Sequence, residues 1–209
     1  MRAKLLIGAV AVLVVVLGFV IVRHITASSW DIAHIPPKND VIVAFGDSLV
    51  SGVGSSRGND FVSLLEKKLG REVINLGVPG NTTADGLARI ESVLELDPGL
   101  VILLLGGNDA LRRISRAETR RNLSEIIVQL NANGTAVLLL GVRGGLIGDP
   151  FDEMFSELAE FYGAGYAPNV LADILLKPEL TQDQIHPNDA GYIIVADRVF
   201  DALQPMLRE

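Results

Sequence analysis

The sequence predicts an α/β domain in which helices cover both faces of a mostly parallel sheet. Short apolar runs rich in β-branched residues alternate with segments of helical spacing from residue 41 to the C-terminus, as in parallel sheets with crossover helices. Val, Leu, Ile and Gly are abundant and only 5% of residues are aromatic, which favours such a sheet over an all-β sandwich. We expect one three-layer α/β/α domain with a five-stranded sheet at residues 41–209.

Residues 1–24 differ from the rest and indicate a membrane anchor. Leu5–Val22 is an unbroken apolar run of 18 residues, close to the ~20 that a helix needs to cross the hydrocarbon core. Arg2 and Lys4 precede it and Arg23 follows it, which favours a cytoplasmic N-terminus with the domain on the periplasmic or extracellular side. The alternative is a cleaved signal peptide and a secreted protein. A buried core helix is disfavoured because the run has no polar face.

The elements of the domain follow a spacer at residues 25–40, where Pro36-Pro37 and the lack of helical spacing indicate a stiff connection. The expected strands are Val41–Phe45, Val73–Leu76, Leu100–Leu105, Ala136–Leu140 and a weak fifth strand around Val170–Ile174. The expected helices are Phe61–Leu69 between an Asn59 or Asp60 cap and Gly70, a helix capped by Thr82 or Thr83, a helix from Ser115 to Asn133-Gly134, a helix near Phe151–Tyr162, and Asp189–Leu203.

Composition and charge exclude several classes of function. The chain has no cysteine, so it has no disulfide framework, thiolate metal site or cysteine nucleophile. Three of its 18 cationic residues precede Asp31, the first acidic residue, which leaves 15 against 25 acidic residues and a net charge of about −10 for the domain. Such an acidic body is a poor match for nucleic acid. No clustered ligands suggest a metal, so we expect neither a metal nor an organic cofactor.

Polar residues gather where three of the expected strands end: Asp47-Ser48, Gly80-Asn81 and Asn108-Asp109. Because the carboxyl ends of parallel strands share one edge of a sheet, these clusters should converge. Ser48 at such a corner is a candidate nucleophile. A serine that transfers acyl groups also needs a base, a group that orients the base, and donors for the developing oxyanion.

His186 is the candidate base, because the other two of the three histidines lie in the N-terminal anchor and spacer. Asp183, three residues earlier, can accept a hydrogen bond from the imidazole and hold its tautomer. Pro187 suits a first helical position, which would put His186 at a helix start whose partial positive charge disfavours imidazolium. Taken alone, a histidine beside a proline is more often a capping residue than a catalyst.

Three groups are candidate oxyanion donors: the backbone N–H of Ser48, the backbone N–H of Gly80 and the side-chain amide of Asn108. Gly80 would allow a close approach of the backbone, and Asn108 follows two glycines at a strand end. Each of the last two, taken alone, is more often an ordinary turn residue.

Together these motifs resemble the SGNH (GDSL) hydrolases, most closely the bacterial thioesterase I/protease I/lysophospholipase L1 and arylesterase-like members. Four blocks stand in the family's order: Gly46-Asp47-Ser48-Leu49, Pro79-Gly80-Asn81-Thr82, Gly106-Gly107-Asn108-Asp109 and Asp183-Gln184-Ile185-His186-Pro187-Asn188. The resemblance implies a flavodoxin-like fold, Ser48 as nucleophile, His186 as base and Asp183 as its partner. It implies that Gly80 and Asn108 complete the oxyanion hole with Ser48. Val50 replaces the second glycine of a Gly-x-Ser-x-Gly elbow, which disfavours an α/β-hydrolase.

Residues beside these motifs are our candidates for substrate contact: Asp47, Asp109, Arg112, Arg143 and Ile185. The resemblance also implies that the loop at residues 141–149 helps to line an acyl pocket. The arginine cluster at positions 112, 113, 116, 120 and 121 is either a solvated helix face or a rim that attracts phosphate or carboxylate groups.

The sequence therefore predicts a membrane-tethered hydrolase of esters or thioesters of lipid-like substrates, an esterase, lysophospholipase or acyl thioesterase. Its partners would be a small acyl substrate and the membrane, and its oligomeric state is left open. A carbohydrate-acetyl esterase acting on envelope polysaccharide is one alternative. A non-catalytic binding domain is a less favoured one.

Overall fold

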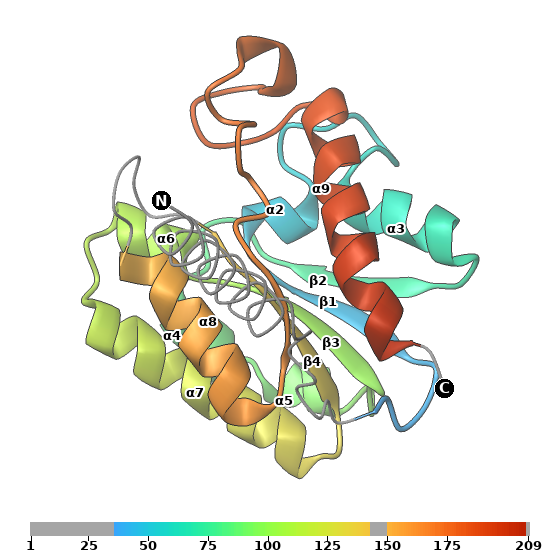
Figure 1. Cartoon of the computed structure of the whole chain (residues 1–209), viewed down its shortest axis with the longest axis vertical. Coiled ribbons are helices and arrows are strands. Elements are labelled where there is room, and N and C mark those ends of the chain that lie inside the picture. The colour runs from blue at the N-terminus through green and yellow to red at the C-terminus, as the bar shows by residue number, and fades with distance from the viewer. Residues whose placement is uncertain (1–35, 143–149, 208–209) are drawn as a thin grey trace, which may run out of the picture. The chain divides into compact units, whose positions relative to one another are not determined.

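Five parallel strands form one sheet in the order β2-β1-β3-β4-β5 (Figure 1). The structure is a computed structural model that describes residues 36–142 and 150–207. All residues of β1, β3 and β4 are buried, as expected of parallel strands covered on both faces. The strands are β1 (Ile42–Gly46), β2 (Val73–Gly77), β3 (Leu100–Leu104), β4 (Ala136–Leu140) and β5 (Gly165–Ala167).

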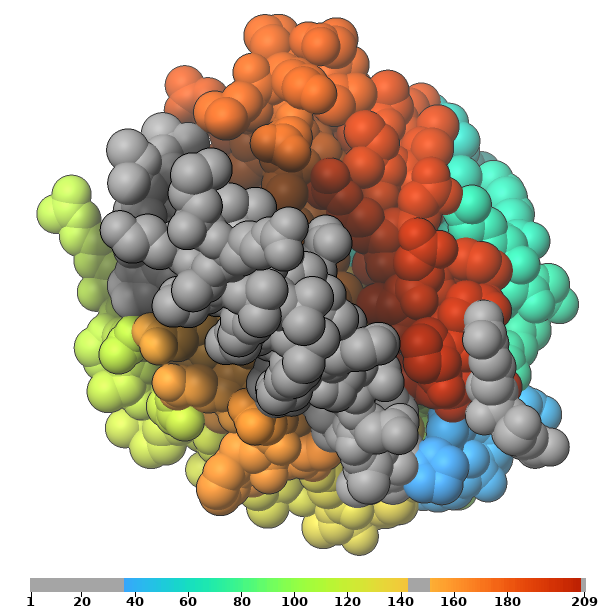
Figure 2. Space-filling view, in the orientation of Figure 1, coloured from blue at the N-terminus to red at the C-terminus, as the bar shows by residue number. Residues whose placement is uncertain are grey.

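Helices cover the two faces of this sheet, which confirms the predicted three-layer α/β/α arrangement (Figure 1). One face carries α3 (Phe61–Leu69) and α9 (Asp189–Leu203), which pack against each other and lie side by side in Figure 2. The other face carries α4 (Thr83–Ala88), α7 (Arg116–Ala132) and α8 (Pro150–Tyr162). The shorter helices are α2 (Ser48–Ser51), α5 (Glu91–Leu94) and α6 (Gly107–Leu111), with 3₁₀ turns η1 (Pro178–Leu180) and η2 (Gln204–Met206).

The strand order creates a switch point between β1 and β3. From β1 the chain crosses to β2 on one side, and it then returns to β3 on the other side. Open α/β sheets form a crevice at the carboxyl ends of the two strands that flank such a point. Ser48 follows β1 and Asn108 follows β3, so both lie at this crevice.

Local sequence signals fix the helix ends where they were predicted. Asp60 caps α3 by accepting a hydrogen bond from the Ser63 N–H at 2.9 Å, and Gly70 ends the helix with φ 66°. Thr82 caps α4 in a capping box with Asp85. Ser115 caps α7 through the N–H of Glu118. These caps satisfy amide groups that a helix start leaves without intrahelical partners.

The fifth strand was predicted at the wrong place. It is formed by Gly165–Ala167, which pairs with β4, and not by Val170–Ile174. Val170 and Ile174 are fully buried, so their apolar character reflects packing. Asn169 and Asp173 have φ of 31° and 59°, which breaks the extended conformation that a strand needs. Apolar residues of a turn therefore gave a false strand signal.

The N-terminal anchor predicted at residues 1–24 lies outside the described residues, as does most of the spacer. The described residues belong to one compact unit, His34–Glu209. Within residues 36–142 and 150–207, no helix has the length and apolar character to cross a membrane.

Candidate active site

The corner after β1 holds Ser48 at the edge of the sheet. Asp47 caps the short helix α2 by accepting a hydrogen bond from the Leu49 N–H at 3.0 Å. Gly46 is needed because a Cβ there would lie 2.2 Å from the Leu104 carbonyl oxygen of β3. The close approach of two strands and a side-chain cap therefore present Ser48 as the first residue of α2.

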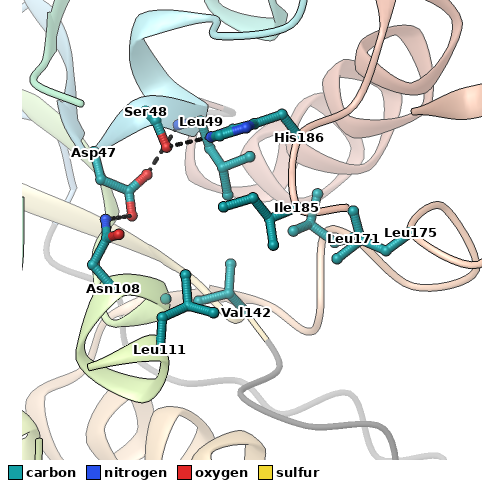
Figure 3. A pocket seen from close by; sticks show the side chains of 11 residues that line it. Asp47, Ser48, Leu49, Asn108, Leu111, Val142, Leu171, Leu175, Ile185 and His186 are labelled. Carbon is teal, nitrogen blue, oxygen red and sulfur yellow. Dashed lines mark hydrogen bonds between the residues drawn. The ribbon is translucent and has the colours of Figure 1, made fainter. Parts of the chain in front are cut away.

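Ser48, His186 and Asp183 form a hydrogen-bonded chain. The Ser48 Oγ lies 2.9 Å from Nε2 of His186 (Figure 3), and Nδ1 of His186 lies 2.8 Å from Oδ2 of Asp183. The imidazole contact and the backbone N–H groups of Ile185 and His186 hold the pKa of Asp183 below its usual value. An ionised Asp183 accepts from Nδ1–H, which leaves Nε2 as the acceptor that faces Ser48.

The histidine lies on a loop that is tied to the loop following Ser48. Thr181 and Pro187 form an antiparallel bridge, and the Gln182 N–H donates to the His186 carbonyl at 2.9 Å. Asp189 accepts from the N–H and the hydroxyl of Ser56 at 2.7 and 2.6 Å. These bonds fix the base against the segment that carries the nucleophile.

The predicted position of Pro187 in the first helical turn was wrong. Helix α9 begins at Asp189 with Asn188 as its cap, so Pro187 and His186 precede the helix. The dipole of α9 therefore does not account for the state of His186, because its effect falls off beyond the first turn. The contact that orients the imidazole is the one with Asp183.

The three candidate oxyanion donors follow three neighbouring strands. Gly80 has φ 82°, a conformation that favours glycine. Within the described part of the chain, the N–H groups of Ser48 and Gly80 have no hydrogen-bond acceptor. The Asn108 amide donates to the Asn81 carbonyl at 3.0 Å and to Oδ2 of Asp47 at 3.3 Å. Two backbone donors are thus available for an added ligand.

An apolar pocket adjoins Ser48 and His186 (Figure 3). Ile185, a predicted substrate contact, lines it. The sequence analysis did not identify the other apolar lining residues, which are Leu49, Leu111, Leu171 and Leu175. Val142 of the predicted acyl-pocket loop also lines it. Arg143 and the rest of that loop, up to residue 149, lie outside the described residues.

Asp109 was wrongly predicted as a substrate contact. Its side chain is fully buried and absent from the pocket lining. The carboxylate accepts hydrogen bonds from the N–H of Thr83 at 2.9 Å, the Thr83 hydroxyl at 2.5 Å and the Thr119 hydroxyl at 3.3 Å. Asp109 therefore joins α6 to α4 and α7.

The other two candidates contact the protein itself. Asp47 borders the pocket but is 2% exposed, and its carboxylate accepts from Leu49 and Asn108. Burial raises its pKa to about 6. Arg112 is exposed and donates from Nη2 to the Gly80 carbonyl at 2.8 Å. A substrate role for either residue stays a prediction.

The described ranges contain no group of three or more His, Asp or Glu side chains arranged to hold a metal ion. The geometry instead provides a hydroxyl, a base with an oriented tautomer, two free N–H groups and an apolar pocket. These are the parts that acyl transfer to a serine requires.

Comparison with known proteins agrees with this chemistry. Residues 44–194 match the model of the GDSL-like lipase/acylhydrolase family. The chain belongs to this family. This GDSL-like hydrolase is 31% identical over 178 residues to the esterase TesA of Pseudomonas aeruginosa, which covers 79% of this chain and 89% of TesA. It is 30% identical over 177 residues to thioesterase 1/protease 1/lysophospholipase L1 of Escherichia coli (strain K12), covering 80% and 85% of the two chains.

The likeness of the GDSL-like hydrolase extends to its fold. A crystal structure of TesA matches it with a TM-score of 0.76 at 30% identity, covering 80% of this chain and 100% of that one. The α/β fold with a parallel five-stranded sheet is therefore that of the SGNH hydrolases.

Proposed function

We propose that this GDSL-like hydrolase cleaves carboxylic esters or thioesters of lipid-like molecules through an acyl-enzyme on Ser48. The observation that carries the proposal is the chain of contacts from Ser48 through His186 to Asp183, at 2.9 and 2.8 Å. A serine hydroxyl is a weak nucleophile until a positioned base accepts its proton.

The reaction proceeds in two steps. Ser48 Oγ attacks the acyl carbonyl while its proton passes to Nε2 of His186, and collapse of the tetrahedral intermediate transfers that proton to the leaving alkoxide or thiolate. Water then attacks the acyl-enzyme, giving a proton to His186, which returns it to Ser48 as the acid leaves. Asp183 stabilises the imidazolium in both steps.

The oxyanion is received by the N–H groups of Ser48 and Gly80 and by the amide of Asn108. The 3.3 Å contact of that amide with Asp47 is long for an N–H···O bond. The hydrogen that makes this weaker contact is therefore the one that an oxyanion can accept in place of Asp47. Loss of one such donor costs about 10²–10³ in kcat in serine hydrolases.

The apolar pocket lining supports an acyl chain as the group bound beside Ser48. Leu111 and Leu175 lie on different sides of the pocket in Figure 3, and Ile185 lies between the base and these residues. Burial of each methylene contributes about 0.8 kcal/mol, so an acyl chain longer than acetyl gains affinity here. The names esterase, thioesterase and lysophospholipase of its relatives are consistent with this substrate class.

We also propose that the enzyme is held at a membrane. Residues 1–24 would anchor it in a membrane, residues 25–40 would act as a spacer, and the hydrolase domain at 41–209 would lie on the periplasmic or extracellular side. The apolar run at Leu5–Val22 and the preceding Arg2 and Lys4 support this arrangement.

A substrate series tests the function. The full-length protein in mild detergent is assayed with p-nitrophenyl esters from acetate to laurate, an acyl-CoA thioester, lysophosphatidylcholine and acetylated xylan. We expect kcat/KM to rise by about tenfold or more from acetate to a medium chain, since several buried methylenes add binding energy. Turnover confined to acetylated xylan would support the carbohydrate esterase, and no turnover of any substrate would contradict the proposal.

A further inference from the structure

Arg89 joins the ends of two strands beneath the candidate oxyanion hole. It is half-buried just after α4. Its Nε donates to Oδ1 of Asn81 at 2.7 Å, and its Nη2 donates to the Gly46 carbonyl at 2.8 Å. The guanidinium carbon lies 4.2 Å from the centroid of the Phe45 ring, within the range of a cation–π contact.

Both acceptors of Arg89 are next to oxyanion donors. Gly46 lies two residues before Ser48, and Asn81 directly follows Gly80. The backbone carbonyl of Asn81 also accepts from the Asn108 amide at 3.0 Å. The guanidinium therefore links the segments of Ser48 and Gly80 directly, and Asn81 links them to Asn108.

The turn that presents Gly80 has few other bonds to hold it. The Val78 N–H donates to Gly46 and the Asn81 N–H donates to Val78, at 3.0 and 3.1 Å. The exposed Arg112 adds a bond to the Gly80 carbonyl, and the Asn108 amide adds the one to the Asn81 carbonyl. Arg89 is the more buried of the two arginines, so its bonds are less exposed to competing water.

We propose that Arg89 is a positioning residue that fixes the Gly80 N–H and the Asn108 amide relative to Ser48. The inference rests on the proposed function, because it concerns the same oxyanion. A planar guanidinium offers donors in a rigid fork, so two bonds in fixed directions set the separation of the two segments. Arg89 is absent from the pocket lining and acts through the donors. A lysine has one nitrogen and cannot hold both acceptors in this geometry.

The test compares Arg89→Gln and Arg89→Lys with the wild-type full chain. Hydrolysis of a short p-nitrophenyl ester gives kcat and KM, and a boronic acid that forms a tetrahedral adduct gives a Ki that depends on the oxyanion donors. We expect kcat to fall about 100-fold in both variants, comparable to the loss of one donor. KM should change less than threefold, and the boronate Ki should weaken in parallel with kcat.

Thr135→Val is the matched control for lost stability. Thr135 is fully buried at the opposite end of the sheet, and its hydroxyl donates to the Pro98 carbonyl at 2.8 Å. The kcat of Thr135→Val should stay within about twofold of that of wild type, even if the Tm of this variant falls as far as the Tm of the Arg89 variants. Equal losses of kcat in the control and in Arg89→Gln, or a loss confined to KM, would overturn the proposal.

Asn81→Ala keeps the test decisive if the Arg89 variants do not fold. It removes the Oδ1 acceptor of Arg89 but keeps the backbone carbonyl that receives the Asn108 amide. We expect about a tenfold loss of kcat and an unchanged KM, whereas a wild-type kcat would overturn the inference. A wild-type chain that hydrolyses no ester would instead contradict the proposed function, so the two failures are distinguishable.

Discussion

Asp47 carries a buried carboxyl group directly before the nucleophile. Burial raises its pKa to about 6, although the Leu49 N–H and His186 act in the opposite direction. At neutral pH the group is ionised and accepts bonds from Leu49 and Asn108. The side chain therefore supports the donor amide at a cost in folding stability.

The first prediction concerns this cost. The folded-state pKa of about 6 lies above the reference value of 3.8, so the folded state binds the proton more tightly. This tighter binding adds up to ~3 kcal/mol to the free energy of unfolding below pH ~4. The contribution is lost as pH rises through about 6. Asp47→Asn cannot ionise and does not lose this contribution. Its free energy of unfolding, measured relative to that of wild type, should therefore rise by roughly 2–3 kcal/mol from pH 4 to pH 7.

Urea unfolding of both proteins at pH 4, 5, 6 and 7 measures this difference. The change in the difference isolates the ionisation of Asp47, since the other titratable groups are the same in both proteins. A difference between the variants that is constant over this range would contradict the assigned environment of Asp47.

Among single residues, the sequence predicted the three side chains that the structure joins in one hydrogen-bonded chain, but it misassigned a neighbour. Ser48, Asp183 and His186 could be found because each stands in a short motif and His186 is the only histidine of the expected domain. Asp109 could not be separated from Asn108 in this way. The two are consecutive in a helix and point about 100° apart, and the threonines that bind Asp109 are distant in sequence.

At the scale of elements, the buried carboxylate of Asp109 connects three helices. It receives the N–H and hydroxyl of Thr83 at the start of α4 and the hydroxyl of Thr119 in α7. Because α6 also carries Asn108 and Leu111, this network fixes the helix that supplies a donor and a pocket wall.

The second prediction is that Asp109→Ala destabilises the fold by about 2–4 kcal/mol. The substitution leaves the buried N–H and hydroxyl of Thr83 without their acceptor, whereas the Thr119 hydroxyl can still donate to the Ser115 carbonyl at 3.2 Å. Unsatisfied buried polar groups cost about 1–3 kcal/mol each before relaxation. Thermal and urea unfolding measure the effect. Asp201→Ala, at an exposed position of α9, is the control and should stay within about 0.5 kcal/mol of wild type. Equal stabilities of the two variants would contradict the role of Asp109.

The elements differ in how much their sequence reveals. Helices α3, α4 and α7 have side-chain caps at the predicted ends. Helices α2 and α6 have four and five residues, too few for a helical period. Strand β5 has three residues and includes Gly165, where a Cβ would lie 2.4 Å from the Met206 sulfur. Packing of distant residues, not local pattern, defines these short elements.

For the whole molecule, sheet topology explains why distant motifs meet. Strand order β2-β1-β3 brings the loops that carry Gly80, Ser48 and Asn108 to adjacent strand ends. The sequence predicted this convergence from strand–helix alternation alone. It could not predict the bonds from Asp189 to Ser56 that hold the histidine loop, because they join residues 133 positions apart.

The third prediction concerns the N-terminal segment. Expressed in a bacterium, the full chain should remain in the membrane pellet after carbonate extraction, because the proposed anchor is an apolar run long enough to span the bilayer. A version that begins at residue 25 with its own start codon should be in the soluble fraction. A shortened, soluble product from the full chain would show cleavage of a signal peptide and would contradict the anchor.

Covalent labelling distinguishes Ser48 from every other candidate nucleophile. The full chain is treated with a fluorophosphonate, its mass is measured, and its remaining p-nitrophenyl butyrate hydrolysis is assayed, beside an untreated Ser48→Ala variant. We predict a single adduct on Ser48, and the fraction of protein labelled should equal the fraction of activity lost. The kcat of Ser48→Ala should be at least ~1,000-fold lower than that of wild type. An adduct on another residue, or turnover that survives in Ser48→Ala, would contradict the assignment of Ser48 as nucleophile.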